Sequence, residues 1–240
     1  LATVSDLDFS AQNGTITDVA VVGGTGNTQV SFTLTPTEDF TGTMSVSANV
    51  TGLTDANGNA GDAAAVALAT AINVDTDAPD VTSITDNQGD AIINLADGNI
   101  VFTVTFDEAI ATALAVGDIT LTNGTLVGIM EDTANRVYLV EVEPTLGLQA
   151  ADVTLEVGTS VTDVAGNPLS ASVSASQSAD TSRPTVTSIV SDVTDVKAGE
   201  SATITVTYSE AIDPATVSDL DFSAQNGTIT DVAVVGGTGN

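Results

Sequence analysis

The sequence predicts an all-β protein built from repeated β-sandwich modules, and three observations lead to that prediction. Thr, Val, Ser, Asp, Asn and Gly dominate the composition, and these residues suit strands and tight turns better than helices. The stretch Ala2–Asn27 recurs letter for letter at Ala215–Asn240. Apolar and polar residues alternate with a period of two through the middle of the chain, which is typical of strands with one buried face.

The composition limits what the cores contain. The 240 residues suffice for about two domains of ordinary size. Hydrophobic residues make up 42% of the chain, but aromatic residues make up 3% and Trp is absent. The cores must therefore consist mainly of Val, Ile, Leu and Ala.

A second, diverged repeat lies inside the long one. PDVTSI at Pro79–Ile84 matches PTVTSI at Pro184–Ile189, and FDEAI at Phe106–Ile110 matches YSEAI at Tyr208–Ile212. Internal repeats at a fixed spacing indicate an array of similar structural units.

The repeats divide the chain into three parts. We expect residues 1–78 to be the C-terminal part of one module, residues 79–183 to be a complete module, and residues 184–240 to be the N-terminal part of a third. Because both ends cut through modules, the chain reads as a window on a longer array, with a deliberately permuted chain as the alternative. The missing half of each end module would come from continuing chain or from a neighbouring copy.

The complete module contains seven expected strands. About seven short strands in about 105 residues, without helical periodicity, predict a Greek-key Ig-like sandwich. The dipeptide Asn123-Gly124 predicts a tight turn between two of them. The expected strands are Val81–Ile84, Ile100–Phe106, Asp118–Thr122, Thr125–Met130, Val137–Glu143, Val153–Val157 and Ser172–Ser178.

The charge balance excludes one class of partner and suggests another. Asp and Glu number 32 against three basic residues, which gives a formal net charge of −29. Nucleic acid is excluded, because no basic patch could neutralise phosphates, and direct binding to or insertion into a membrane is not expected. The acid excess has two readings, solubility in salty surroundings and binding of divalent cations such as Ca²⁺.

The absence of Cys and His removes most catalytic chemistry. Without Cys there is no thiol nucleophile, disulfide or thiolate zinc site, and without His the commonest general base is missing. The remaining acids lie in turns of a repeated unit, with no aromatic residues to bind a sugar. We therefore expect no enzyme activity.

Strand direction predicts where the acids gather. The linker into the complete module, the end of its second strand and the loop before its last strand should all lie at one end of the sandwich. Ca²⁺ takes six to eight oxygen ligands from carboxylates and carbonyls. Turn formation is the alternative reading, because Asp and Asn favour turns through bonds to the backbone. The expected ligands are Asp75, Asp77, Asp107, Glu108, Asp163 and Asn167.

The second junction departs from this pattern. Asp180 takes the place of Asp75, but Ser182 and Arg183 stand where the first junction has Asp77 and Ala78. We expect Arg183 to pair with Glu210 there, so that a fixed cation replaces the ion.

The order of these motifs carries a resemblance to a known family. Asp-Thr before a proline, then VTSI, then an F-x-E-A segment, then NGT and TD-x-x-GN resembles the bacterial Ig-like repeats of giant surface adhesins and biofilm-associated proteins. The resemblance covers essentially the whole chain. It implies export, tandem stacking and often Ca²⁺ at the junctions between modules.

These observations predict a structural role outside the cell. We expect a repeat segment of an extracellular fibre or adhesin stalk at the bacterial cell surface, with modules stacked end to end and stiffened by calcium. Its partners would be neighbouring repeats of the same array and other copies in a filament. The alternative is an adhesion module whose loops bind a glycan or a host protein.

Overall fold

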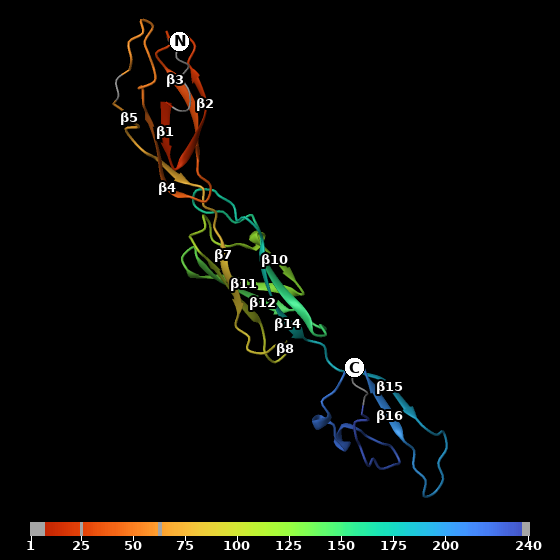
Figure 1. The fold of residues 1–240 in the computed structure, drawn as a ribbon. Helices are drawn as coiled ribbons and strands as arrows, with labels where there is room; N and C mark the ends of the chain where they lie inside the picture. Colours follow the sequence, from red (N-terminus) through yellow and green to blue (C-terminus); the bar gives the residue numbers. More distant parts are fainter. Residues whose placement is uncertain (1–7, 25, 62–63, 237–240) are drawn as a thin grey trace. The chain divides into compact units, whose positions relative to one another are not determined.

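The computed structural model describes residues 8–24, 26–61 and 64–236 (Figure 1). These residues form two compact units, Leu1–Asp180 and Thr181–Asn240. In both units the regular structure is almost entirely β, with short 3₁₀ turns, as the composition predicts.

Residues 81–180 form a complete sandwich of two four-stranded sheets. One sheet has the order β11-β12-β9-β7 and the other has the order β10-β13-β14-β8. All pairings are antiparallel except that of β14 with β8. The strands are β7 (Val81–Asp86), β8 (Ile92–Asn94), β9 (Ile100–Phe106), β10 (Ile119–Thr122), β11 (Gly124–Thr133), β12 (Val137–Pro144), β13 (Ala151–Val157) and β14 (Val173–Asp180).

The core lies between the two sheets and is mainly aliphatic, with Phe102, Phe106 and Tyr138 as its aromatic members. Inward residues alternate with outward ones along β9, β12 and β13, so each strand contributes a row of buried side chains. Phe106 and Tyr138 meet edge to face with ring centroids 6.2 Å apart. The fully buried apolar residues of the sheets are Ile93, Ile100, Phe102, Val104, Val140, Val142, Val153, Leu155, Val157 and Ala179.

The structure confirms the predicted fold class of Ig-like sandwich, and adds two features. All seven expected strands are present within a few residues of their predicted ends, but β8 was not predicted because it has three residues. Asn123 has a φ of 56°, as a tight turn requires. The turn joins β10 of one sheet to β11 of the other, so it forms a corner of the sandwich instead of a hairpin.

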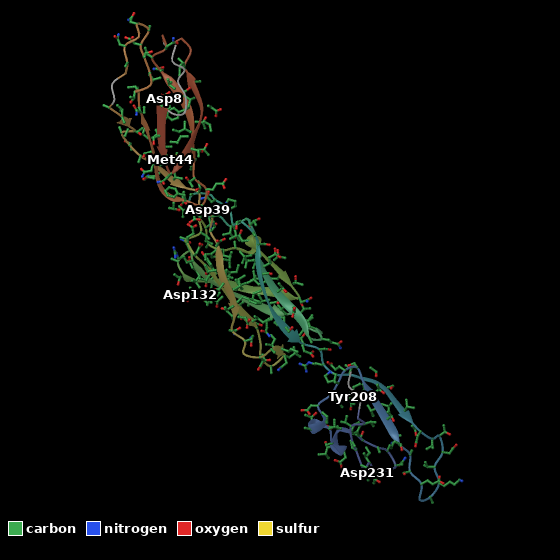
Figure 2. The ribbon with its side chains drawn as sticks, viewed as in Figure 1. Asp8, Asp39, Met44, Asp132, Tyr208 and Asp231 are labelled. Atoms are coloured by element: carbon green, nitrogen blue, oxygen red, sulfur yellow. The ribbon has the colours of Figure 1, made fainter. Side chains whose placement is uncertain are left out.

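The first 75 residues contain part of a second sandwich. Here β2 pairs with β3, and β4 pairs with β1, β5 and β6. Met44 and Val74 are buried (Met44 is labelled in Figure 2). The strands are β1 (Phe9–Gln12), β2 (Gly14–Val21), β3 (Val30–Pro36), β4 (Thr41–Ala48), β5 (Val66–Ala67) and β6 (Ile72–Asp75).

In the C-terminal unit, the described residues 181–236 contain one pair of strands. β15 (Val186–Ser191) pairs with β16 (Ile204–Tyr208), and two 3₁₀ turns follow at Pro214–Thr216 and Asp219–Asp221. Its apolar side chains are more exposed than those of the complete sandwich; Ile189 and Ile204 are 66% and 55% exposed.

Candidate metal centre

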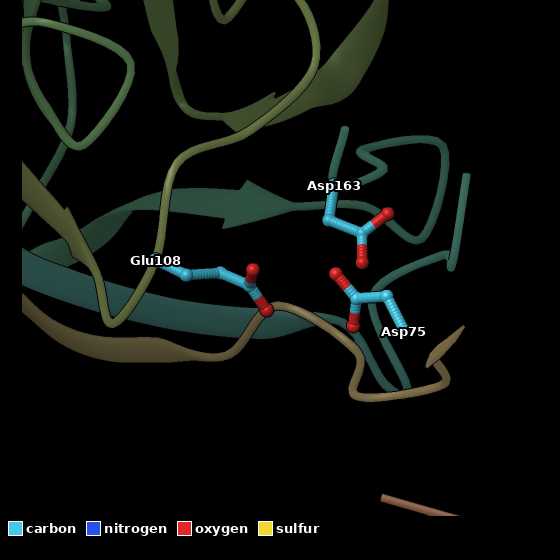
Figure 3. Close-up of side chains that lie close together, drawn as sticks. All are labelled: Asp75, Glu108 and Asp163. Carbon is cyan, nitrogen blue, oxygen red and sulfur yellow. The ribbon is translucent and has the colours of Figure 1, made fainter. Parts of the chain in front are cut away.

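Three carboxylates converge where the linker enters the complete sandwich. Asp75, Glu108 and Asp163 each offer an oxygen that lies within 4.8 Å of the others, and the three side chains point toward one another (Figure 3). They come from segments far apart in the sequence, so the tertiary structure brings them together.

Asp75 is held by the strand on which the linker begins. It is the last residue of β6, where it pairs with Thr41 of β4. The Thr41 hydroxyl donates a hydrogen bond of 2.9 Å to Asp75 Oδ1. This contact leaves Oδ2 available for another ligand.

Asp163 lies in the loop between β13 and β14, and its side chain is buried, with 1% of the residue exposed. Its Oδ1 accepts hydrogen bonds from the amides of Gly166 and Asn167, at 2.6 and 2.8 Å. Burial raises the pKa of Asp163, but the hydrogen bonds from Asn167 and Gly166 lower it by more than burial raises it. The pKa of Asp163 therefore lies below its usual 3.8. Asp163 is therefore an anion at neutral pH.

Asn167 connects this loop to the linker. Its Nδ2 donates to Asp163 Oδ2 at 2.7 Å, to the Asp77 carbonyl at 2.9 Å and to the Asp75 carbonyl at 3.2 Å. The sequence predicts Asn167 as one of the ligands of the ion. In the structure, its amide nitrogen forms hydrogen bonds to both the linker and the loop, and so connects the two.

Glu108 follows β9 and is partly buried. Burial raises its pKa, and the negative charges of Asp163, Asp107, Asp75 and Asp77 raise it further. All four charges that act on Glu108 are negative, so this end of the sandwich concentrates negative charge.

Asp77 and Asp107 contribute to that charge but lie outside the group of three. The Asp77 side chain is exposed, while its carbonyl accepts from Asn167. Asp107 Oδ1 accepts a hydrogen bond of 2.8 Å from the amide of Asp80, which ties the start of β7 to the end of β9. Of the six expected ligands, the structure brings three carboxylates together.

The three carboxylates fit a hard divalent cation. Carboxylate oxygens are the ligands that Ca²⁺ prefers, and one ion could take several of them with water completing the set. An ion there would offset the mutual repulsion of the carboxylates. Sequence reasoning missed Thr41, because nothing in the linker shows which strand will hold Asp75.

At the second junction, the structure does not show the expected pairing of Arg183 with Oε1 of Glu210. Glu210 takes the place of Glu108 in the repeat, and its Oε1 is buried without a hydrogen-bond partner among the described residues. Arg183 therefore does not bind that oxygen.

Comparison with known proteins gives one match. A family model described as a bacterial Ig-like domain matches residues 75–179 and residues 180–239. A search of curated proteins found no match, and neither did a search of solved structures. The predicted boundaries after residues 78 and 183 stay predictions. Within the described ranges, no helix has the length and apolar character needed to cross a membrane.

Proposed function

Because this chain belongs to the bacterial Ig-like domain family, we propose that it is a structural repeat segment of an extracellular fibre or adhesin stalk at the bacterial surface. Its modules stack end to end, and Ca²⁺ bound where the linker follows Asp75 stiffens the joint. Neighbouring repeats are its partners, and it performs no catalysis.

The convergence of Asp75, Glu108 and Asp163 supports this proposal most directly. One of the three carboxylates belongs to the last strand before the linker, and the other two belong to the sandwich after it. A cation held by all three would therefore connect the linker to the sandwich. The charged groups that raise the pKa of Glu108 are all carboxylates, so a bound cation would offset their mutual repulsion.

Hydrogen bonds within the chain itself position the residues of this site. Thr41 orients Asp75, and the loop around Asp163 is closed by hydrogen bonds from Gly166 and Asn167. Asn167 also holds the linker backbone against the loop. Bound Ca²⁺ would supply the charge that these contacts lack, so that the joint resists both bending and unfolding.

Thermal unfolding of the chain with Ca²⁺ and with excess EGTA tests the calcium site. A ligand present at about 100 times its Kd stabilises the folded state by about 2.7 kcal/mol. For a domain of this size that corresponds to a rise in Tm of about 10 °C. Asp75→Asn and Glu108→Gln should each remove most of this rise.

Glu143→Gln is the matched control, because Glu143 is exposed on β12 and is not one of the three clustered acids. It should respond to Ca²⁺ as the parent does. The same Tm with millimolar Ca²⁺ and with EGTA would refute the calcium site. An equal loss of response in all three variants would show a general charge effect instead of a site.

Ca²⁺ should also protect the linker from proteolysis if it stiffens the joint. A protease that cleaves between Asp75 and Pro79 should cut more slowly when Ca²⁺ is present, and Asp75→Asn should abolish the difference. Equal cleavage rates in a chain that binds Ca²⁺ would contradict the stiffening role while leaving the site intact.

A further inference from the structure

Four strands of the complete sandwich lie at the edges of its sheets. In the order β11-β12-β9-β7 the edges are β11 and β7, and in the order β10-β13-β14-β8 they are β10 and β8. The structure describes all of residues 81–180, so no part of this sandwich is left out. An edge strand exposes a row of unpaired N–H and C=O groups, to which a strand of another molecule can bond.

The inner strands of the same sandwich are long and regular. β9, β12, β13 and β14 have seven, eight, seven and eight residues. The pairings of β12 with β9 and of β13 with β14 run without a shift in register. The module therefore forms long, regular ladders where a strand lies between two neighbours.

The edge strands, in contrast, are short or interrupted. β8 has three residues and β10 has four. β7 has a register shift between Val81 and Ser83, which leaves the four residues Ser83–Asp86 as its regular part. None of these three edges offers more than four regular residues in a row, whereas an ordinary strand has about five or six.

The longest edge strand is β11, which has ten residues. Leu126 of β11 lies opposite Val142 of β12. Gly128 lies opposite Glu141, which directly precedes Val142 in β12. Val127 therefore has no partner and forms a β-bulge, and it is 52% exposed.

Asp132 forms a second bulge in β11. The residues on either side of it, 131 and 133, lie opposite consecutive residues of β12, so Asp132 is unpaired as well. Its side chain is exposed (labelled in Figure 2). Between the two bulges β11 has the four regular residues Gly128–Glu131, and so it is limited in the same way as the other three edges.

The first unit interrupts the corresponding strand with different residues. β2 begins at Gly14 as β11 begins at Gly124, and each follows an Asn with a positive φ. The register of β2 shifts between Thr17 and Ala20, so two residues of β2, the first of them Asp18, oppose one residue of β3. Two diverged copies of the module therefore keep an interruption in this strand, although the residues that form it differ.

A bulge breaks the row of free backbone groups along an edge. The extra residue disrupts the alternation of N–H and C=O groups and increases the local twist of the strand. The net charge of −29 also keeps copies apart, but salt screens that repulsion. The Debye length falls from about 8 Å at 0.15 M ionic strength to about 3 Å at 1 M, whereas a bulge acts at any salt concentration.

We propose that the bulges at Val127 and Asp132 prevent β11 from pairing with a strand of another copy, so that modules do not associate side by side through their sheets. Repeated modules need such a barrier, because every copy carries similar edges and exposed edges are templates for pairing. This role goes beyond the stacking of modules end to end. It does not require calcium, because no residue of β11 belongs to the three clustered acids.

Deletion of Val127 tests the role of the first bulge. Gly128 then follows Leu126 directly and keeps its place opposite Glu141, so the inward side chains stay inward and the regular part of β11 grows from four residues to seven. The deletion leaves the net charge unchanged and removes an exposed apolar side chain, so neither lost repulsion nor added apolar surface would explain association. Val127→Thr is the matched control, because it keeps the bulge.

Sedimentation velocity in EGTA and about 1 M NaCl compares the three proteins at rising concentration, because the salt removes most of the charge repulsion and EGTA excludes the calcium site. The parent and Val127→Thr should sediment alike. The deletion variant should dimerise at least about tenfold more tightly than the parent, since seven regular residues form more backbone hydrogen bonds between strands than four. Hydrogen exchange of the amides in segment 124–133 should slow as that variant associates.

A folded deletion variant that stays as monomeric as the parent would overturn the proposal. So would association that leaves hydrogen exchange in segment 124–133 unchanged, or a parent chain that associates through that segment. Far-UV circular dichroism and urea unfolding establish whether the variant folds. If it does not, deletion of Asp132, with Asp132→Asn as its control, decides the question by the same measurements, because it extends the regular stretch from four residues to five.

Discussion

Glu108→Gln should stabilise the protein when calcium is absent. Glu108 is partly buried among carboxylates, and both its burial and their charges raise its pKa above the ordinary 4.5. Gln keeps the shape of the side chain and removes its charge. The substitution that abolishes the response to Ca²⁺ should therefore raise the free energy of unfolding in EGTA.

The separation of the carboxylates gives the magnitude. Oxygens of Asp75 and Asp163 lie within 4.8 Å of an oxygen of Glu108. At that distance two unit charges repel by about 0.9 kcal/mol in water and about 3.5 kcal/mol at an effective dielectric constant near 20. Because Glu108 is partly exposed, we take the lower end and expect a gain of about 2 kcal/mol from losing both repulsions.

The pH dependence of this gain follows from the direction of the pKa shift. A carboxyl whose pKa is raised by folding stabilises the folded state below its unfolded pKa and loses that contribution as pH rises through the folded pKa. The advantage of Glu108→Gln should thus be full above the raised pKa of the folded state and vanish as pH falls below 4.5.

Urea unfolding in EGTA at low ionic strength measures the difference, with Glu143→Gln as the control. The gain should shrink with added salt, although charges this close are screened incompletely by a Debye length of about 10 Å. If Glu108→Gln is no more stable than the parent at neutral pH, the repulsion inferred from the cluster does not exist.

Two further predictions concern packing and the linker. Phe102→Ala should lower the free energy of unfolding by about 3–5 kcal/mol, because Phe102 is fully buried. Ile204→Ala should change it little, because Ile204 on β16 is 55% exposed, and equal losses by urea unfolding would contradict this difference in burial. Asn167→Ala should lower it by about 1–3 kcal/mol, since three acceptors lose their donor. Asn59→Ala is its matched control, with a smaller loss expected because Asn59 and Asp55 are both exposed, and equal losses would show that the bonds from Asn167 to the linker contribute nothing.

The repeated β-sandwich could be predicted from local features. Alternating residues along Ile100–Phe106 place every second side chain on one face whatever the rest of the chain does, and the structure buries that face. The three-residue strand β8 could not be predicted, because so short a segment has no measurable period. Its pairing with β14 depends on a strand about 85 residues away.

The candidate site was predictable as a region but not as a set of ligands. Chain direction indicates that Asp75, Glu108 and Asp163 belong to one end of the sandwich. It does not show that Asp107 bonds to the amide of Asp80, or that Asn167 turns its nitrogen toward the linker. Those choices depend on which donors and acceptors lie within about 3 Å of each side chain, and local sequence does not encode that.

The sequence by itself determined the fold class, the repeat and the negative charge of this protein, because strand periodicity, turn residues and composition act over a few residues. The tertiary structure decided which carboxylates meet and which copies of a repeated segment become strands. The identical residues at 9–21 and 222–234 show why: a strand needs a partner for its backbone hydrogen bonds. For residues 9–21 that partner is supplied by β3 and β4, segments that follow later in the chain.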